Sequence, residues 1–96
     1  MDSLKVIDLF SGAGGLSQGF RDAGCNIISA VEINKNLSQT FRNNFKKTKI
    51  FEEDISKVKS KDLLVNESKV DIVIGGPPCQ GFSMSSKRIR GNGIFL

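Results

Sequence analysis

The sequence contains no histidine and only two cysteines, and these two scarcities remove several classes of chemistry. Without histidine, nucleophilic catalysis by a Ser-His or Cys-His pair is excluded within this chain. Cys25 and Cys79 are too few and too far apart for a disulfide framework or a zinc site, so we expect no metal centre. A reduced, cytoplasmic setting is therefore the default expectation.

Long apolar runs are also missing. No stretch approaches the roughly 20 residues that span a bilayer, so we expect no membrane partner. The first residues, Met1 to Lys5, show neither the basic start nor the apolar segment of a secretory signal. The 96 residues are 39% apolar and 25% charged, which is typical of one ordinary globular domain at most.

Charge is unevenly distributed along the chain. Residues 1–34 carry two basic and four acidic side chains, whereas residues 35–96 carry twelve and six, so the net charge changes from −2 to +6. A basic second half suits a polyanionic partner such as nucleic acid. On charge alone, a solvated lysine-rich surface is the better explanation.

Short apolar segments alternate with glycine-rich turns and helical patterns. We expect strands over residues 6–10, 25–33, 49–52 and 70–74, and helices over 16–23 and 35–45, with one further helical turn near Leu63. Leu37, Phe41 and Phe45 share one face of the second helix, and Asn34 can cap its start. This alternation predicts an α/β fold with a parallel sheet and helices on both faces.

Ligands of such sheets bind at the carboxyl ends of the strands. The turn after the first strand, residues 10–15, reads Phe-Ser-Gly-Ala-Gly-Gly, and its glycines allow a ligand to approach the backbone closely. Glu32 follows the second strand, twenty residues after Gly12, where a carboxylate can accept hydrogen bonds from both hydroxyls of a ribose. The spacing predicts an adenosine-containing cofactor, with a tight turn that binds nothing as the alternative.

Two further observations bear on the cofactor. The dinucleotide fingerprint G-x-G-x-x-G is not met, because Ser17 stands where its third glycine would be, and this speaks against NAD. Asp54 follows the third strand, where it can accept a hydrogen bond from an adenine amino group. It can equally cap a helix or be a solvated acid in the acidic run 52–54.

The fourth strand leads into residues 75–83, which read Gly-Gly-Pro-Pro-Cys-Gln-Gly-Phe-Ser. The prolines stiffen the backbone before Cys79, and glycines on both sides permit close approach of a substrate. A cysteine at a strand tip beside a cofactor cleft is a candidate nucleophile. Only its thiolate attacks, and no histidine activates it, so activation of the substrate must carry more of the barrier. An isolated cysteine is more often a small buried apolar residue, which is our interpretation of Cys25.

Residues 8–16, Asp-Leu-Phe-Ser-Gly-Ala-Gly-Gly-Leu, and residues 75–83 resemble the first and fourth motifs of the cytosine-5 DNA methyltransferases. The Pro-Pro-Cys-Gln sequence at a strand tip is rare outside that family. Glu32 and Asp54 stand at the places of its second and third motifs, and residues 87–96 are similar to its catalytic loop running into the fifth. The resemblance implies a Rossmann-like S-adenosylmethionine-dependent methyltransferase fold, of which this chain would hold the first four strands.

The resemblance also implies an activity, which is methyl transfer from S-adenosylmethionine to cytosine C5 in DNA. The thiolate of Cys79 would add to C6 of a base flipped out of the duplex and make C5 nucleophilic. The implied cofactor site consists of Phe10, Gly12, Gly14, Gly15, Leu16, Glu32, Ile33, Asp54, Ile55, Gly76 and Pro78. The implied DNA contacts are Pro78, Gln80, Ser83, Lys87, Arg88 and Arg90.

Other family motifs do not occur in these residues. The Glu-Asn-Val motif, the Gln-x-Arg-x-Arg motif and the region that reads the target sequence are all missing. We therefore expect residues 1–96 to be the N-terminal part of the catalytic domain of a longer or split enzyme, with a complementary chain as partner if it is split. Three alternatives stay open: a binding module without chemistry, an NAD-linked oxidoreductase fragment, and a cytosine-5 tRNA methyltransferase.

Overall fold

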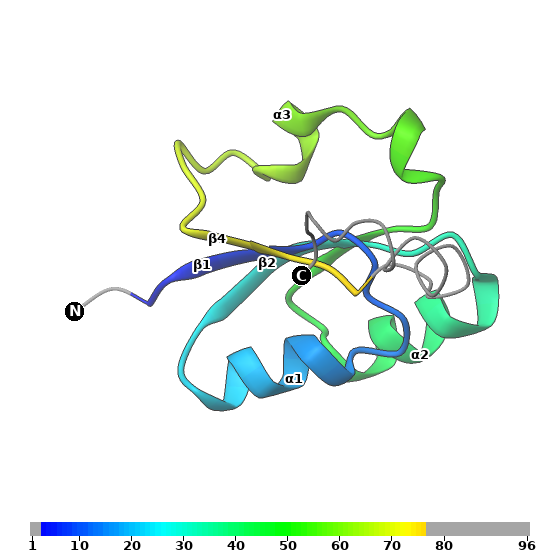
Figure 1. Cartoon of the computed structure of the whole chain (residues 1–96), viewed down its shortest axis with the longest axis horizontal. Coiled ribbons are helices and arrows are strands. Elements are labelled where there is room, and N and C mark those ends of the chain that lie inside the picture. The colour runs from blue at the N-terminus through cyan, green and yellow to red at the C-terminus, as the bar shows by residue number, and fades with distance from the viewer. Residues whose placement is uncertain (1–2, 77–96) are drawn as a thin grey trace, which may run out of the picture.

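The computed structural model describes residues 3–76, which form a four-stranded parallel sheet with helices on both faces (Figure 1). The strands are β1 (Lys5–Asp8), β2 (Asn26–Val31), β3 (Lys49–Phe51) and β4 (Ile72–Ile74). Their order in the sheet is β3-β2-β1-β4, and every neighbouring pair is parallel. The expected α/β fold is confirmed. The strands are shorter than their apolar runs, because residues such as Phe10 and Ile33 leave the ladder to line a cavity.

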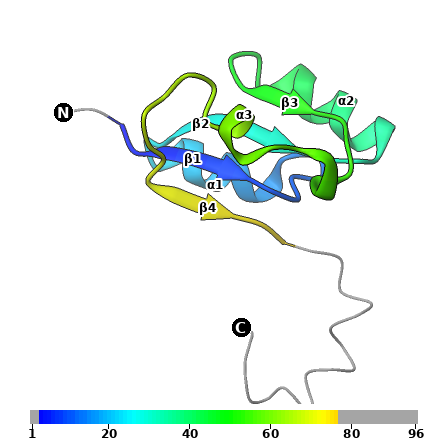
Figure 2. The same ribbon diagram turned by 90° about the horizontal axis from the view of Figure 1, so that it is seen from above.

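The helices divide between the two faces of the sheet. Helices α1 (Gly15–Asp22) and α2 (Lys35–Asn44) cover one face, and the 3-10 turn η1 (Ile55–Lys57) with the short α3 (Ser60–Leu63) covers the other (Figures 1 and 2). The chain thus runs outward from β1 to β3 along one face and returns across the other to β4. The direction of winding reverses between β1 and β4, which is where doubly wound sheets bind ligands.

Each face of the sheet has its own buried core. Val6 of β1 belongs to the cluster under α1 and α2, and the next residue, Ile7, belongs to the cluster under α3. The first cluster also contains Ile27, Ala30, Phe41 and Phe45, and the second also contains Ile28, Val31 and Leu63. Burial on both faces explains why β1 and β2 appear in the sequence as continuous apolar runs rather than as alternating ones.

Helix α2 begins at the cap that the sequence suggests. The Oδ1 atom of Asn34 accepts a hydrogen bond from the Leu37 backbone N–H at 2.9 Å. Phe41 and Phe45 are buried and stack with ring centroids 4.2 Å apart and 12° between the ring planes. Leu37 shares their face but is 40% exposed, because that end of the face lies at the cavity described below.

Strand β4 is joined to the start of β1 by Asp71. Its Oδ2 atom accepts a hydrogen bond from the Lys5 backbone N–H at 2.7 Å, and its own N–H donates to the Lys5 carbonyl oxygen at 2.9 Å. The first of these bonds lowers the pKa of Asp71, and the nearby Lys69 ammonium contributes. Within residues 3–76, β4 has a paired neighbour on one side only, and its Val73 is 54% exposed. In this part of the chain, no helix has the length and apolar character that a membrane crossing requires.

Candidate functional site

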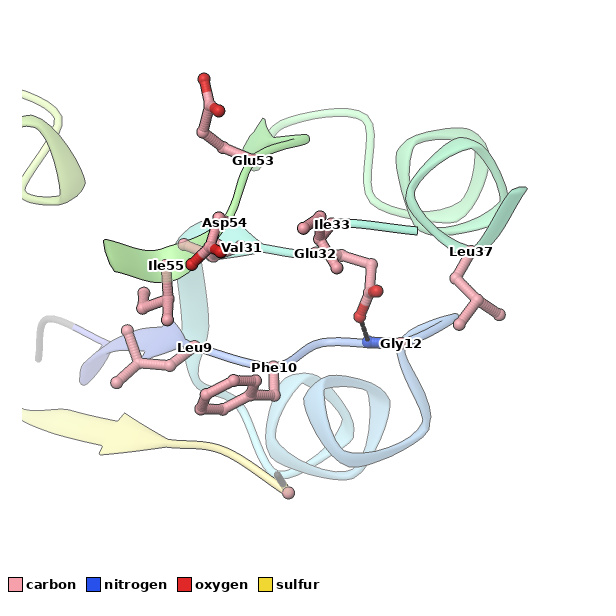
Figure 3. Close-up of a pocket in the computed structure, with 11 residues that line it drawn as sticks. Leu9, Phe10, Gly12, Val31, Glu32, Ile33, Leu37, Glu53, Asp54 and Ile55 are labelled. Atoms are coloured by element: carbon pink, nitrogen blue, oxygen red, sulfur yellow. Dashed lines mark hydrogen bonds between the residues drawn. The ribbon is translucent and has the colours of Figure 1, made fainter. Parts of the chain in front are cut away.

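A cavity of about 370 Å³ opens at the carboxyl ends of β1, β2 and β3 (Figure 3). Its position is the one that the parallel sheet predicts for a ligand site. The lining residues come from the last residue of β2, from the segments that follow β1, β2, β3 and β4, and from the first turn of α2: Leu9, Phe10, Gly12, Val31, Glu32, Ile33, Leu37, Glu53, Asp54, Ile55 and Gly76.

Glu32 joins the two segments that form the centre of this cavity. Its Oε1 atom accepts a hydrogen bond from the Gly12 backbone N–H at 2.8 Å, and Oε2 accepts one from the Asn34 backbone N–H at 2.9 Å. Figure 3 shows the carboxylate reaching from the end of β2 to the turn after β1. Each oxygen of an ionised carboxylate has more than one acceptor position, so the fixed side chain can still accept hydrogen bonds from ligand hydroxyls.

The walls beside Glu32 are apolar and accessible. Phe10, Ile33 and Leu37 are 37%, 64% and 40% exposed, although all three are large hydrophobic residues. Exposed apolar side chains gathered around one charged group are typical of small-molecule sites, in which apolar walls bind the flat part of a ligand and the polar group orients it. The cavity therefore suits a ligand with a flat apolar ring and neighbouring hydroxyl groups.

Asp54 lies at the edge of the cavity and caps η1. Its Oδ1 atom accepts hydrogen bonds from the backbone N–H and the hydroxyl of Ser56, both at 2.9 Å. These bonds lower the pKa of the exposed carboxyl, which is therefore ionised at neutral pH. The capping interpretation of Asp54 is confirmed. A contact with adenine, which would use the other carboxylate oxygen, stays a prediction.

The glycine-rich turn divides into two functional parts. Gly12 lines the cavity, whereas Gly14, Gly15 and Leu16 do not: Gly14 caps α1 in a left-handed conformation with φ 109°, and the other two are the first residues of the helix. The structure thus brings together seven of the residues expected to hold the cofactor: Phe10, Gly12, Glu32, Ile33, Asp54, Ile55 and Gly76.

Four lining residues escaped the sequence analysis. Leu9 and Val31 belong to apolar runs that looked like core, and Glu53 stood inside an acidic run. Leu37 was placed on the correct helix face, but its spacing does not reveal that this face ends at a cavity. The remaining expected residues, Pro78, Cys79, Gln80, Ser83, Lys87, Arg88 and Arg90, lie outside the described residues. Gly76 lines the cavity, and Cys79 follows it by three positions in the sequence.

A buried acid lies near the turn. Asp8 is fully buried, and its Oδ2 atom accepts a hydrogen bond from the Ser17 hydroxyl at 2.6 Å. Within the described part of the chain, Oδ1 has no hydrogen-bond partner. Burial raises the pKa of Asp8, the Ser17 hydroxyl and the Phe10 backbone N–H partly offset this rise, and the Glu32 carboxylate adds to it. Asp8 was not among the residues predicted from the sequence, although a carboxylate inside an apolar strand is a signal that could have identified it.

The fold and the cavity define a class, the doubly wound α/β proteins that bind a ligand at the ends of their strands. The family model for C-5 cytosine-specific DNA methylases matches residues 4–93. The chain therefore belongs to the C-5 cytosine-specific DNA methylase family. It is 49% identical over 87 residues to the type II methyltransferase M1.HphI of Haemophilus parahaemolyticus, an alignment that covers 88% of this chain and 23% of that protein.

Two solved structures support the same relationship. A prophage-encoded E. coli protein, assigned as a DNA modification methyltransferase, matches with a TM-score of 0.74 and 44% identity over 83% of this chain and 24% of its own. A mutant of Spodoptera frugiperda DNMT2 matches with a TM-score of 0.68 and 28% identity over 98% of this chain and 26% of its own. The chain spans 20% to 36% of the length of the first three curated relatives.

Proposed function

We propose that this chain supplies the cofactor-binding and nucleophile-bearing part of an enzyme that methylates cytosine at C5 in DNA, with S-adenosylmethionine as the methyl donor. One observation carries the proposal. In a chain of the C-5 methylase family, the Glu32 carboxylate is held by the Gly12 and Asn34 backbone amides in a cavity walled by Phe10 and Ile33.

The residues of the cavity fit the chemical parts of this cofactor. Glu32 would accept hydrogen bonds from the two ribose hydroxyls, and Phe10 with Ile33 would contact the flat faces of the adenine. Asp54 and Ile55 would lie at the adenine edge. The cavity volume of about 370 Å³ falls within the usual range for small-molecule sites. When bound, S-adenosylmethionine supplies an electrophilic methyl group.

The nucleophile in this proposal is the thiolate of Cys79. It adds to C6 of the cytosine, and the displaced electron pair makes C5 nucleophilic. After methylation, loss of the C5 proton and expulsion of the thiolate restore the ring and release Cys79. Because the thiolate both attacks and leaves, Cys79 is regenerated unchanged.

Delivery of the base requires it to leave the duplex, which costs a few kcal/mol. In the proposal, Pro78 positions the flipped base, and Gln80 and Ser83 contact it or the strand. Lys87, Arg88 and Arg90 contact the phosphates, in agreement with the +6 net charge of residues 35–96. A binding module without chemistry would bind the cofactor equally well but would have no use for Cys79.

Titration calorimetry of the full chain with S-adenosylmethionine tests the cofactor site. Glu32→Gln removes the charge that accepts the ribose hydroxyls, and hydrogen bonds to charged groups contribute about 1.5–3 kcal/mol, so we expect affinity to fall about 10- to 100-fold. Glu53→Gln is the matched control, because Glu53 borders the same cavity but its side chain points away from it (Figure 3).

Two results would reject this assignment of the cavity. One is a wild-type chain that binds NAD more tightly than S-adenosylmethionine. The other is equal affinity of the Glu32→Gln and Glu53→Gln variants. The tRNA alternative is tested separately, by comparing the methylation of DNA and tRNA in an assembly that contains this chain.

A further inference from the structure

The glycine turn after β1 rests directly on two aromatic rings, those of Phe41 in α2 and of Phe45, the residue that caps the end of α2. A Cβ atom added to Gly14 would lie 2.5 Å from Cε1 of Phe45 and 3.1 Å from Cδ2 of Phe41. Distances this short leave no room for a side chain, so the backbone at Gly14 is in contact with the rings. Gly12, in the same turn, has no atom within 4 Å of its added Cβ. The two glycines are therefore required for different reasons.

We propose that Phe41, Phe45 and Arg21 form a positioning platform, meaning a rigid support that fixes the turn 11–15 and thereby the Gly12–Glu32 pair. This inference rests on the proposed function, because the Gly12–Glu32 pair is the group assigned to the cofactor ribose. None of the three platform residues lines the cavity, so they act on the cofactor only through the turn.

The platform is held on several sides. The two rings stack at 4.2 Å, and Phe41 and Phe45 are 0% and 3% exposed. The guanidinium carbon of Arg21 lies 4.1 Å from the centroid of the Phe45 ring, within range for a cation–π contact. Arg21 also donates a hydrogen bond from Nη1 to the Asn44 carbonyl oxygen at 2.7 Å. The Phe45 ring is thus held between the Phe41 ring and the Arg21 guanidinium, which join it to α2 and α1.

The turn transmits this constraint to the cavity through short backbone bonds. The Gly14 N–H donates to the Ser11 carbonyl oxygen at 3.0 Å, and the Ser11 N–H donates to the Val31 carbonyl oxygen at 3.0 Å. Between these two bonds lies Gly12, whose N–H donates to Glu32 at 2.8 Å. A displacement of the backbone at Gly14 therefore also displaces the Gly12 N–H, two residues away, and weakens its hydrogen bond to Glu32.

A rescue experiment tests the contact between Gly14 and Phe45. Gly14→Ala alone introduces the short contact with the ring, and we expect it to weaken binding of S-adenosylmethionine strongly. Phe45→Leu removes the ring atoms that the new methyl group would meet. Residues in direct contact are energetically coupled, so we expect the double variant to bind about tenfold more tightly than the two single losses multiplied together would give.

Gly12→Ala is the matched control for this rescue. Gly12 also has a positive φ, 57°, so alanine is strained there as it is at Gly14, but no ring lies nearby. We expect the losses caused by Gly12→Ala and Phe45→Leu to multiply, with no rescue. A rescue of equal size at both glycines would show that Phe45→Leu merely softens the domain, and it would overturn the proposal.

A second measurement needs no cofactor. The NMR resonance and the hydrogen exchange of the Gly12 amide report the geometry of the turn in the free chain. We expect Phe45→Leu to shift this resonance and to accelerate its exchange. Phe20→Leu, which removes a ring packed against the same core cluster, should lower stability and leave the Gly12 amide unchanged.

The two proposals fail in different ways. If the wild-type chain does not bind S-adenosylmethionine, the proposed function fails, and the Gly12 amide still decides whether the platform exists. If the wild-type chain binds but Phe45→Leu changes neither the affinity nor the Gly12 amide, the platform is rejected and the proposed function stands.

Discussion

At the scale of single residues, Asp8 and Ser17 form a buried pair close to the cavity turn. The Ser17 hydroxyl donates to the Asp8 carboxyl at 2.6 Å, and both side chains are fully buried. Because burial raises the pKa of Asp8, this carboxyl binds a proton at a higher pH in the native state than in the unfolded chain. The resulting stabilisation is present below the model-peptide value of 3.8 and is lost as pH rises through the folded pKa.

Ser17→Ala should therefore destabilise the protein in a pH-dependent manner. At pH 7 it removes a hydrogen bond to a buried ionised group, which costs about 2 kcal/mol of unfolding free energy. Near pH 4 a larger fraction of Asp8 is protonated, and the loss should be smaller. Urea unfolding at the two pH values measures the difference. Ser29→Ala is the control: its hydroxyl is equally buried but donates to the Leu63 carbonyl oxygen, so its cost should not depend on pH.

Some residues of the cavity could be predicted from the sequence alone, whereas the surroundings of others could not. Glu32 was predicted from its spacing to Gly12, and the structure joins the two at 2.8 Å, because a β-α-β unit of this length returns the end of β2 beside the end of β1. Gly14 was grouped with Gly12 as a cofactor residue, yet it packs on Phe45 instead of lining the cavity. Both are glycines in one turn, and only the position of α2 distinguishes them.

At the scale of secondary-structure elements, α2 depends on a local cap. The side chain of Asn34 accepts a hydrogen bond from the Leu37 N–H, while its backbone N–H donates to Glu32. Asn34→Ala removes the first bond and keeps the second. We expect a loss of about 1 kcal/mol in unfolding free energy with little change in cofactor affinity. Thermal unfolding and titration calorimetry on the same variant check both parts, and a large loss of affinity at unchanged stability would contradict them.

At the junction of β1 and β4, we expect Asp71 to give a dependence of folding stability on pH that is opposite to that of Asp8. The pKa of Asp71 is lowered by the Lys5 backbone N–H, so its contribution to stability is present above the model-peptide value of 3.8 and is lost as pH falls through the folded pKa. Asp71→Asn should therefore reduce stability at pH 7 and flatten the stability profile below pH 4. Urea unfolding across this range measures it. If the variant loses stability at low pH as steeply as the wild-type chain does, other carboxylates control acid unfolding.

At the scale of the whole molecule, the described residues place the cavity at one end of a sheet whose β4 edge is paired on one side only. The four strands, the parallel sheet and the helices on both faces were predicted from the sequence, because local apolar patterns determine these features. The cavity walls depend on which side chains remain exposed when distant segments meet. Val73 and Leu37 illustrate this, since each has a core-like spacing and is about half exposed in the structure.

The proposed nucleophile, Cys79, requires a test in a complete enzyme, so we consider a chimera that joins this chain to the corresponding remainder of M1.HphI. Duplex DNA with 5-fluorocytosine at the target base of that relative should trap the enzyme, because fluorine at C5 replaces the proton whose loss allows the thiolate to leave. We expect Cys79→Ser to abolish the covalent complex on a denaturing gel, since a serine hydroxyl stays protonated at neutral pH.

Cys25→Ser is the matched control for this experiment. Cys25 packs against the core cluster beside the first residue of β2, at the opposite end of the strand from the cavity. Capture that persists in Cys79→Ser and disappears in Cys25→Ser would assign the chemistry to the wrong end of the sheet and would refute the proposed function.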